Sequence, residues 1–137
     1  MGLFETKKQT VSTERLSFSR QEMAAIIQIA GAMAGADGKA HPNELKMMAN
    51  EANRFGISDT DFKTLLSNAS SMDSGAAIAE IATMNDAQKR YVCAYLGTLM
   101  AIDGEIDNKE KALWQLISTL CKLPTMNIAD ALAYMAN

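Results

Sequence analysis

The sequence predicts an all-α fold, a single compact bundle of about seven helices with an internal pseudo-twofold repeat around two central apolar helices. The composition, 48% apolar and 21% charged over 137 residues, is typical of one globular domain with a single core. Apolar residues recur at helical spacing, and β-branched residues never alternate over a long run. Pairs of helix-capping residues precede most of the apolar segments and give the order of the helices.

Residues 1–18 are polar and lack a sustained period, which predicts a flexible N-terminal tail before a helical domain at 19–137. Ser19 and Glu22 form a capping box that begins the first helix. This helix is apolar on nearly every face. A helix without a polar face packs in the middle of a bundle, so we expect it at the centre.

Three shorter helices are expected next. The first of them runs from about residue 42 to 55, and Gly56 ends it in the left-handed conformation. Ser58 begins another, which gives way to a loop at 67–71. Asp73 or Ser74 caps the fourth helix of the bundle.

Three more helices are expected in the second half of the chain. Asn85 and Gln88 form another capping box, which begins the second central helix. That helix is again apolar on most faces. Asp107 begins a sixth helix that Pro124 stops, and Asn127 begins a last short one.

An offset of 66 residues superimposes the two halves, with Gly31 on Gly97 and Met48 on Trp114. Few positions are identical, but apolar residues and turn residues occupy corresponding positions in the two halves. The matched glycines predict that the two central helices touch backbone to backbone. The turns that follow these helices should then lie at comparable places on the bundle.

These two turns, here called the elbows, carry the candidate functional residues. The first elbow, residues 37–44, reads Asp-Gly-Lys-Ala-His-Pro-Asn-Glu, and the second elbow, residues 103–110, reads Asp-Gly-Glu-Ile-Asp-Asn-Lys-Glu. Each follows an apolar helix and opens another. The acidic residues of the elbows are candidate metal ligands: Asp37, Glu44, Asp103 and Glu110, with Glu105 and Asp107 as additional ligands.

Carboxylates without clustered thiols or imidazoles suit a hard cation, so Ca²⁺, Mg²⁺ or Mn²⁺ is expected rather than Zn²⁺. The second elbow is not an EF-hand loop, because its sixth position is Asn108 instead of glycine and its twelfth is Trp114 instead of glutamate. A cation would therefore need ligands from both elbows or from water.

The same residues also have a purely structural interpretation. Glu44 and Glu110 stand at the third position of a helix, where glutamate caps the first turn and favours the positive end of the helix dipole. The Asp-Gly pairs that begin both elbows are ordinary turn formers. Both interpretations, a cation site and a set of caps and turns, remain open from the sequence.

Other classes of function have little support. The net charge is −3 and no basic patch occurs, which argues against nucleic acid as a partner. His41 fits a helix cap, and neither Cys93 nor Cys121 has a histidine nearby, so we expect no enzyme and no organic cofactor. Both cysteines should be buried reduced thiols. No signal-peptide pattern or membrane-spanning stretch occurs, which predicts a cytoplasmic protein.

The segments Ala36-Asp37-Gly38, Phe55-Gly56-Ile57 and Ile102-Asp103-Gly104, each elbow closing on its glutamate, resemble the tellurite-resistance TerB-like family over about residues 20–137. The resemblance implies an all-helical fold with internal pseudo-symmetry. It also implies an acidic cluster that binds a divalent cation, at the four positions Asp37, Glu44, Asp103 and Glu110.

The TerB-like family is linked to tellurite resistance and stress responses, and its members are interaction modules, often partners of membrane or chaperone-like components. The resemblance therefore implies a stress-response module that binds a divalent cation and acts through membrane-associated or chaperone-like protein partners. The alternative is a metal-free helical adaptor or scaffold whose acidic residues are only helix caps and turns.

Overall fold

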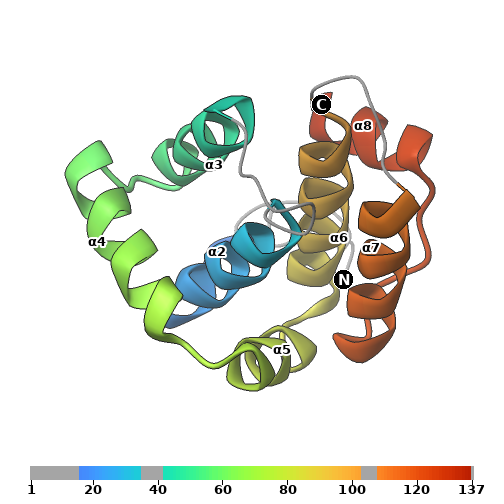
Figure 1. Ribbon diagram of the computed structural model, residues 1–137, viewed down its shortest axis with the longest axis horizontal. Coiled ribbons are helices and arrows are strands. Elements are labelled where there is room, and N and C mark those ends of the chain that lie inside the picture. The colour runs from blue at the N-terminus through green and yellow to red at the C-terminus, as the bar shows by residue number, and fades with distance from the viewer. Residues whose placement is uncertain (1–15, 35–41, 103–107, 137) are drawn as a thin grey trace, which may run out of the picture.

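The computed structural model describes residues 16–34, 42–102 and 108–136. These ranges form seven α-helices and no strand, which confirms the predicted all-α fold (Figure 1). The helices are α2 (Arg20–Ala34), α3 (Pro42–Arg54), α4 (Asp59–Ser71), α5 (Ser74–Ala82), α6 (Asp86–Ala101), α7 (Asn108–Leu120) and α8 (Ile128–Ala136).

The helices α2 and α6 form the centre of the bundle, as their apolar sequences predict (Figure 1). Helices α4 and α5 pack against α2, while α7 and α8 pack against α6. Side chains such as Ile26 on α2 and Leu96 on α6 are completely enclosed. Each buried side chain of this size contributes about 1.5–3 kcal/mol, so the two central helices supply much of the folding energy.

Both predicted capping boxes are present. At α2, the Ser19 amide donates to Glu22 Oε1 at 2.8 Å, and the Glu22 amide donates to Ser19 Oγ at 3.0 Å. The Asn85 and Gln88 pair makes the same two bonds, at 3.0 and 2.8 Å. Gln88 Nε2 also lies 3.4 Å from Glu22 Oε1, so the two boxes meet where the central helices begin.

The glycines of the central helices do not touch each other, and that prediction is wrong. A β-carbon on Gly97 would lie 2.7 Å from Trp114 Cζ2 and 3.0 Å from Ala131 Cβ, so this glycine admits α7 and α8 close to α6. A β-carbon on Gly31 would meet no atom of the described residues within 4 Å. Glycine at position 97 therefore permits close packing of helices, whereas glycine at position 31 has no such role among the described residues.

Helix α4 is longer than predicted, because residues 67–71 continue the helix instead of forming a loop. Ala69 is buried in the core, so the last turn of α4 packs against the bundle. The hydroxyls of Ser70 and Ser71 donate to the carbonyl oxygen of Ser67 at 2.7 and 3.3 Å. Core packing and these bonds outweigh the low helix propensity of serine.

The segment before α2 packs on the bundle, although the sequence placed residues 16–18 in the tail. The ring of Phe18 meets that of Phe55 edge-on at 5.2 Å and that of Tyr91 at 5.5 Å. The carbonyl oxygen of Ser17 accepts a bond from Gln88 Nε2 at 2.8 Å. Aromatic contacts thus extend the ordered packing upstream of Ser19. The rest of the predicted tail, residues 1–15, lies outside the described residues.

Candidate metal centre

The candidate site contains two buried carboxylates on matched helices. Glu44 is the third residue of α3 and Glu110 the third residue of α7, and both helices are 13 residues long. The exposed fractions of these side chains are 3% and 8%. Within the described ranges they are the only buried acidic residues. Neither residue is without an interaction partner in the structure.

The third-position acids of α4 and α8 differ from Glu44 and Glu110 in burial, whereas Glu22 at the third position of α2 is half-buried. Asp61 of α4 and Asp130 of α8 are both exposed to solvent. Asp130 still takes part in capping, because its carboxylate oxygen Oδ2 accepts a bond from the Asn127 amide at 3.4 Å. Capping a helix therefore does not require that a third-position carboxylate be buried. Burial of a carboxylate is costly unless hydrogen bonds or positive charge compensate it, and both Glu44 and Glu110 have an interaction partner in the structure.

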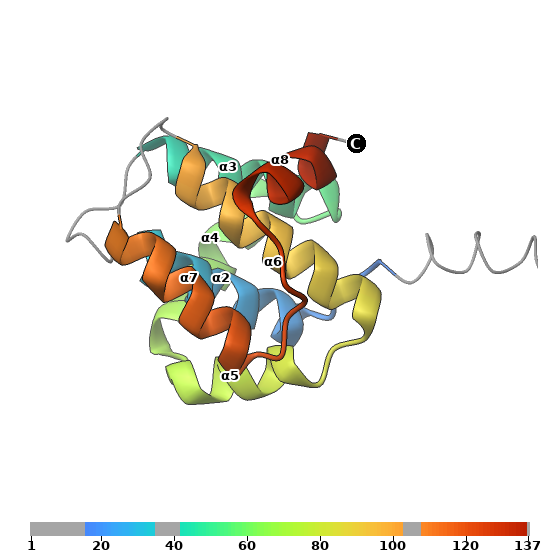
Figure 2. The ribbon, with the colours of Figure 1, turned by 90° about the vertical axis from the view of Figure 1, so that its right-hand side faces the viewer.

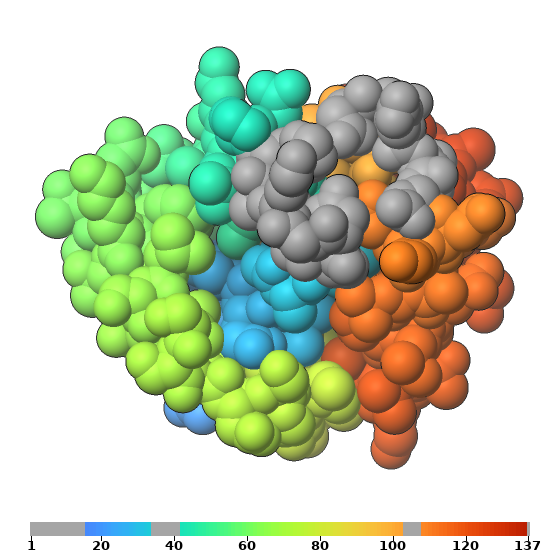
Figure 3. All heavy atoms as spheres, in the orientation of Figure 1, coloured from blue at the N-terminus to red at the C-terminus, as the bar shows by residue number. Residues whose placement is uncertain are grey.

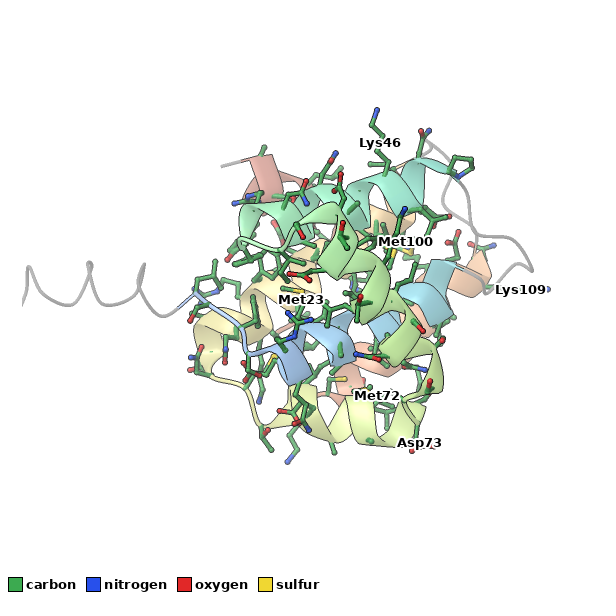
Figure 4. All side chains as sticks on the ribbon, turned by 90° about the vertical axis from the view of Figure 1, so that its left-hand side faces the viewer. Met23, Lys46, Met72, Asp73, Met100 and Lys109 are labelled. Carbon is green, nitrogen blue, oxygen red and sulfur yellow. The ribbon has the colours of Figure 1, made fainter. Side chains whose placement is uncertain are left out.

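The described ends of the two elbows lie at the same end of the bundle. Ile102, the last described residue before the second elbow, shares a shallow hollow with Asn43, Lys46 and Met47 of α3. Figure 2 shows the first turns of α3 and α7 at this end, beside the end of α6. Figure 4 shows Lys46, Met100 and Lys109 toward the same end from the opposite side. The described residues that border the two elbows thus lie at one end of the bundle.

The remaining predicted ligands lie outside the described residues. These are Asp37 in the first elbow and Asp103, Glu105 and Asp107 in the second, and His41 belongs to the same undescribed positions. In the described part of the chain, no group of three or more histidine, cysteine or acidic residues could hold a metal ion. The structure therefore places two of the six candidate ligands, Glu44 and Glu110.

The chemistry of this donor set fits a hard divalent cation. Both described donors are carboxylates, which Ca²⁺, Mg²⁺ and Mn²⁺ prefer. Glu44 and Glu110 are enclosed by protein, so a cation beside them would be weakly screened by solvent. The two carboxylates come from opposite halves of the chain, and a cation that bound both would link the two elbows.

A second polar cluster, which no local sequence pattern predicts, lies near the end of α3. The Tyr91 hydroxyl donates to Glu51 Oε1 at 2.6 Å, and Arg54 Nη1 donates to the same oxygen at 2.9 Å. Burial, together with the bond to Glu51, raises the pKa of Tyr91 far above its ordinary value. Burial likewise raises the pKa of Tyr95, whose ring stacks on Tyr91 at 5.7 Å. Because Glu51 and Tyr91 are forty residues apart, no local pattern links them.

The two cysteines are free and buried, as the sequence predicts. Burial raises the pKa of Cys121 to about 11 and also raises that of Cys93. The Cys93 thiol donates to the carbonyl oxygen of Pro124 at 3.4 Å. Both thiols are thus kept in the protonated form, which is a poor nucleophile and a poor metal ligand.

Part of the chain matches the sequence model of a known protein family. The sequence model of the family described as tellurite resistance protein TerB matches residues 7–67. This match confirms the resemblance to the TerB-like tellurite-resistance family over the first half of the chain. The match includes Asp37 and Glu44 of the first elbow, and it ends before the second. The assignment of the second elbow of this TerB-like chain to the candidate site therefore rests on the position of Glu110 in α7 and not on the family match.

A solved relative has the same fold. The crystal structure of a protein of unknown function from Porphyromonas gingivalis W83 is similar to this TerB-like chain with 48% sequence identity and a TM-score of 0.79. The similarity covers 89% of this chain and 92% of the other. No curated protein matches the chain. Among the helices described, none has the length and apolar character needed to cross a membrane.

Proposed function

We propose that this TerB-like chain is a cytoplasmic stress-response module that binds a divalent cation between its two elbows and acts through protein partners. The observation that carries the proposal is the burial of Glu44 and Glu110 at the third position of two helices of equal length. Asp61 and Asp130, the acids at this position of α4 and α8, are exposed.

An internal repeat, in which the elbows are equivalent, is part of the proposal. Helices α3 and α7 correspond residue for residue at the offset of 66 that relates Glu44 to Glu110. The same offset relates Gly56 and Lys122, which follow these helices with positive φ angles. It also relates Glu22 and Gln88, which are in contact. These correspondences support an approximate twofold axis between α2 and α6.

The bound cation would be held by carboxylates from both halves. Glu44 and Glu110 would supply enclosed oxygen atoms, and Asp37 and Asp103 would complete the paired set, with Glu105 and Asp107 as further ligands of the second elbow. The positive charge would offset the cost of burying the two glutamates. Since the cation would bind only the folded chain, it would stabilise the fold by mass action.

We propose a binding module and not an enzyme. The raised pKa values of Cys93 and Cys121 support this, because they disfavour the thiolate that nucleophilic catalysis requires. The proposed partners are proteins, either membrane-associated or chaperone-like, and nucleic acid is not among them. The mildly acidic net charge of −3 supports that exclusion.

The test is calorimetric titration of chelator-treated protein with Ca²⁺, Mg²⁺ and Mn²⁺. We expect saturable binding of at least one ion, lost in a Glu44→Gln/Glu110→Gln double variant. A matched control, Asp61→Asn/Asp130→Asn, alters the third-position acids of α4 and α8 and should bind as the parent does. Binding that is equal in both variants, or absent from the parent, would contradict the cation site.

A second candidate function, the metal-free adaptor, is favoured by the caps that do form. Glu22 accepts the Ser19 amide at 2.8 Å, so a third-position acid in this fold can serve as a helix cap. In that case Glu44→Ala and Glu110→Ala should each lower the free energy of unfolding by about 1 kcal/mol, because a cap is lost. The parent protein would show no heat of cation binding, and partner binding would survive in both variants.

A further inference from the structure

Residues 16–18 pack on the bundle at the end opposite the first turns of α3 and α7. Figure 2 shows this segment in blue beside the beginning of α6, whereas Figure 3 views the molecule from the other end, where α2, α4, α5 and α7 are visible. The segment precedes α2 and is not helical. It lies on a surface made by Phe55, Gln88 and Tyr91, here called the docking surface.

Phe18 is the main anchor of the segment. Its ring lies 5.2 Å from that of Phe55 and 5.5 Å from that of Tyr91, and these two rings meet edge-on at 5.3 Å. Phe55 follows α3 and Tyr91 belongs to α6, so the cluster joins three segments that are distant in sequence. Aromatic rings prefer tilted and edge-on arrangements, because the edge of one ring is positive and the face of the next is negative. The docking surface therefore favours an aromatic side chain at this position.

Gln88 supplies a polar contact to the main chain of the segment. Its Nε2 donates to the carbonyl oxygen of Ser17 at 2.8 Å, and its Oε1 accepts the Asn85 amide at 3.0 Å. Gln88 is 7% exposed, and the capping box fixes its orientation. At the offset of 66 the corresponding residue is Glu22, and a carboxylate has no N–H group to donate. A buried amide donor aimed at a carbonyl oxygen recognises a group that every peptide carries.

A hollow continues the docking surface beyond Leu16. It has a volume of about 300 Å³ and is lined by Leu16, Arg54, Tyr91, Tyr134 and Met135. Tyr91 belongs both to this hollow and to the ring cluster, so the two are continuous. The hollow can receive an aliphatic side chain two positions before the aromatic anchor, and its size leaves space for further ligand atoms.

The segment is held by contacts that can be exchanged without unfolding a helix. Among the described residues, no backbone-to-backbone hydrogen bond involves positions 16, 17 or 18. Leu16 and Phe18 are half-buried, and Ser17 is exposed. A segment with few buried contacts opens more readily than a core helix. A competing peptide with the same side chains can therefore take its place.

We propose that the docking surface binds an extended peptide of a partner protein, in which an aliphatic residue stands two positions before a phenylalanine. Residues 16–18 are then an internal competitor that occupies the surface until the partner displaces them. The phenylalanine of the peptide lies between Phe55 and Tyr91, and the carbonyl oxygen before it accepts a bond from Gln88. This inference rests on the proposed role as a protein-interaction module, and it names the class of partner.

The same segment of a second copy fits this surface less well. Phe18 is followed directly by the capping box of Ser19 and Glu22, which begins a helix at the centre of the bundle. Because no linker separates the segment from this helix, an exchange between copies would bring α2 of one copy against α6 of the other. An extended peptide of a partner meets no such obstacle.

The experiment is an NMR titration of the full-length, chelator-treated protein with an end-capped peptide of the sequence Arg-Leu-Ser-Phe-Ser, which is that of residues 15–19. In Phe18→Ala the internal competitor loses its anchor, so we expect saturable shifts of the Phe55 amide and of the Gln88 side-chain amide. The peptide should bind this variant at least about tenfold more tightly than the parent, because the affinity of the parent is reduced by the fraction of chains whose docking surface is vacant. A peptide with alanine in place of phenylalanine should bind at least about tenfold more weakly.

Ser17→Ala is the matched control, because it removes an exposed side chain and retains both Phe18 and the main-chain carbonyl oxygen. It should bind the peptide as weakly as the parent does. Equal affinity of Phe18→Ala and the parent, or shifts confined to helices other than α3 and α6, would overturn the proposal. So would a concentration-dependent dimer of the parent that Phe18→Ala abolishes, since a second copy would then be the occupant.

The parent gives a second measurement if Phe18→Ala does not fold. Excess peptide should shift the aromatic resonances of Phe18 as the segment leaves the surface, and unchanged resonances at millimolar peptide would contradict the proposal. The docking surface lies at the end of the bundle opposite the first turns of α3 and α7, and the protein is free of cations in this experiment. Failure of the docking surface is thus distinguishable from failure of the cation site.

Discussion

Gly56 and Lys122 follow helices α3 and α7 with the same left-handed backbone conformation, at φ of 84° and 58°. The amide of the residue after each one returns to the preceding helix, from Ile57 to Ala52 and from Leu123 to Ser118, both bonds of the type that closes a helix. Glycine adopts this conformation without a steric penalty, whereas lysine carries a β-carbon that opposes it. The end of α3 is therefore unstrained, whereas the end of α7 carries backbone strain at Lys122.

Replacing Lys122 with glycine should raise the free energy of unfolding by about 1 kcal/mol, because the strain of the β-carbon is removed. The reverse change, Gly56→Lys, should lower it by a similar amount. Urea denaturation of both variants checks this. A Lys122→Gly protein no more stable than its parent would mean that contacts of the lysine side chain offset the backbone strain.

Gly97→Ala should destabilise the fold by about 1–3 kcal/mol, because the added methyl group displaces Trp114, which is bonded to Cys93. Gly31→Ala is the matched control in the other central helix. No atom of the described residues opposes the methyl group, so this variant should gain up to about 1 kcal/mol of helix propensity. Thermal unfolding of the two variants should therefore move in opposite directions, and parallel shifts would be inconsistent with the packing described.

Tyr91→Phe should lower the free energy of unfolding by about 1–3 kcal/mol, because the Glu51 carboxylate loses a short hydrogen bond. Glu51→Gln keeps an acceptor oxygen for the tyrosine and should cost less. Equilibrium denaturation at neutral pH measures both changes. The bond contributes little if the two variants match the parent.

Stability should fall at alkaline pH because of Tyr91 and Tyr95. Their pKa values are raised in the folded chain by burial, so the unfolded chain releases their protons first, above about pH 10. Below that pH both states retain the protons, and these groups add no pH dependence. Urea midpoints measured across this range should decline, and the decline should be shallower in Tyr91→Phe.

The two thiols should react slowly with iodoacetamide in the native protein. Burial raises the pKa of Cys121 to about 11 and that of Cys93 above its ordinary value, so little thiolate forms at neutral pH. Mass spectrometry should detect alkylation of both residues only after unfolding in denaturant. Rapid labelling of the native chain would show that the helices around Cys121 open readily.

Sequence signals that span only a few residues are sufficient to predict most of the secondary structure. The Ser19–Glu22 and Asn85–Gln88 boxes mark helix starts because their bonds span three residues. Residues 67–71 were predicted wrongly because the serines there favour a loop, while burial of Ala69 comes from distant neighbours. For the candidate site, the sequence predicts which acidic residues are candidate ligands. The burial of Glu44 and Glu110 depends on how the helices pack and could not be derived from their spacing in the sequence.

The sequence by itself determined the all-α class, the order of the helices and the central place of α2 and α6, because propensity, capping and apolar period act within a few turns. The tertiary structure alone decided that Tyr91 bonds to Glu51, that Trp114 packs on Gly97, and that two leucines of α7 remain exposed. These relationships depend on how helices distant in sequence meet, and packing of that kind is set by the whole core.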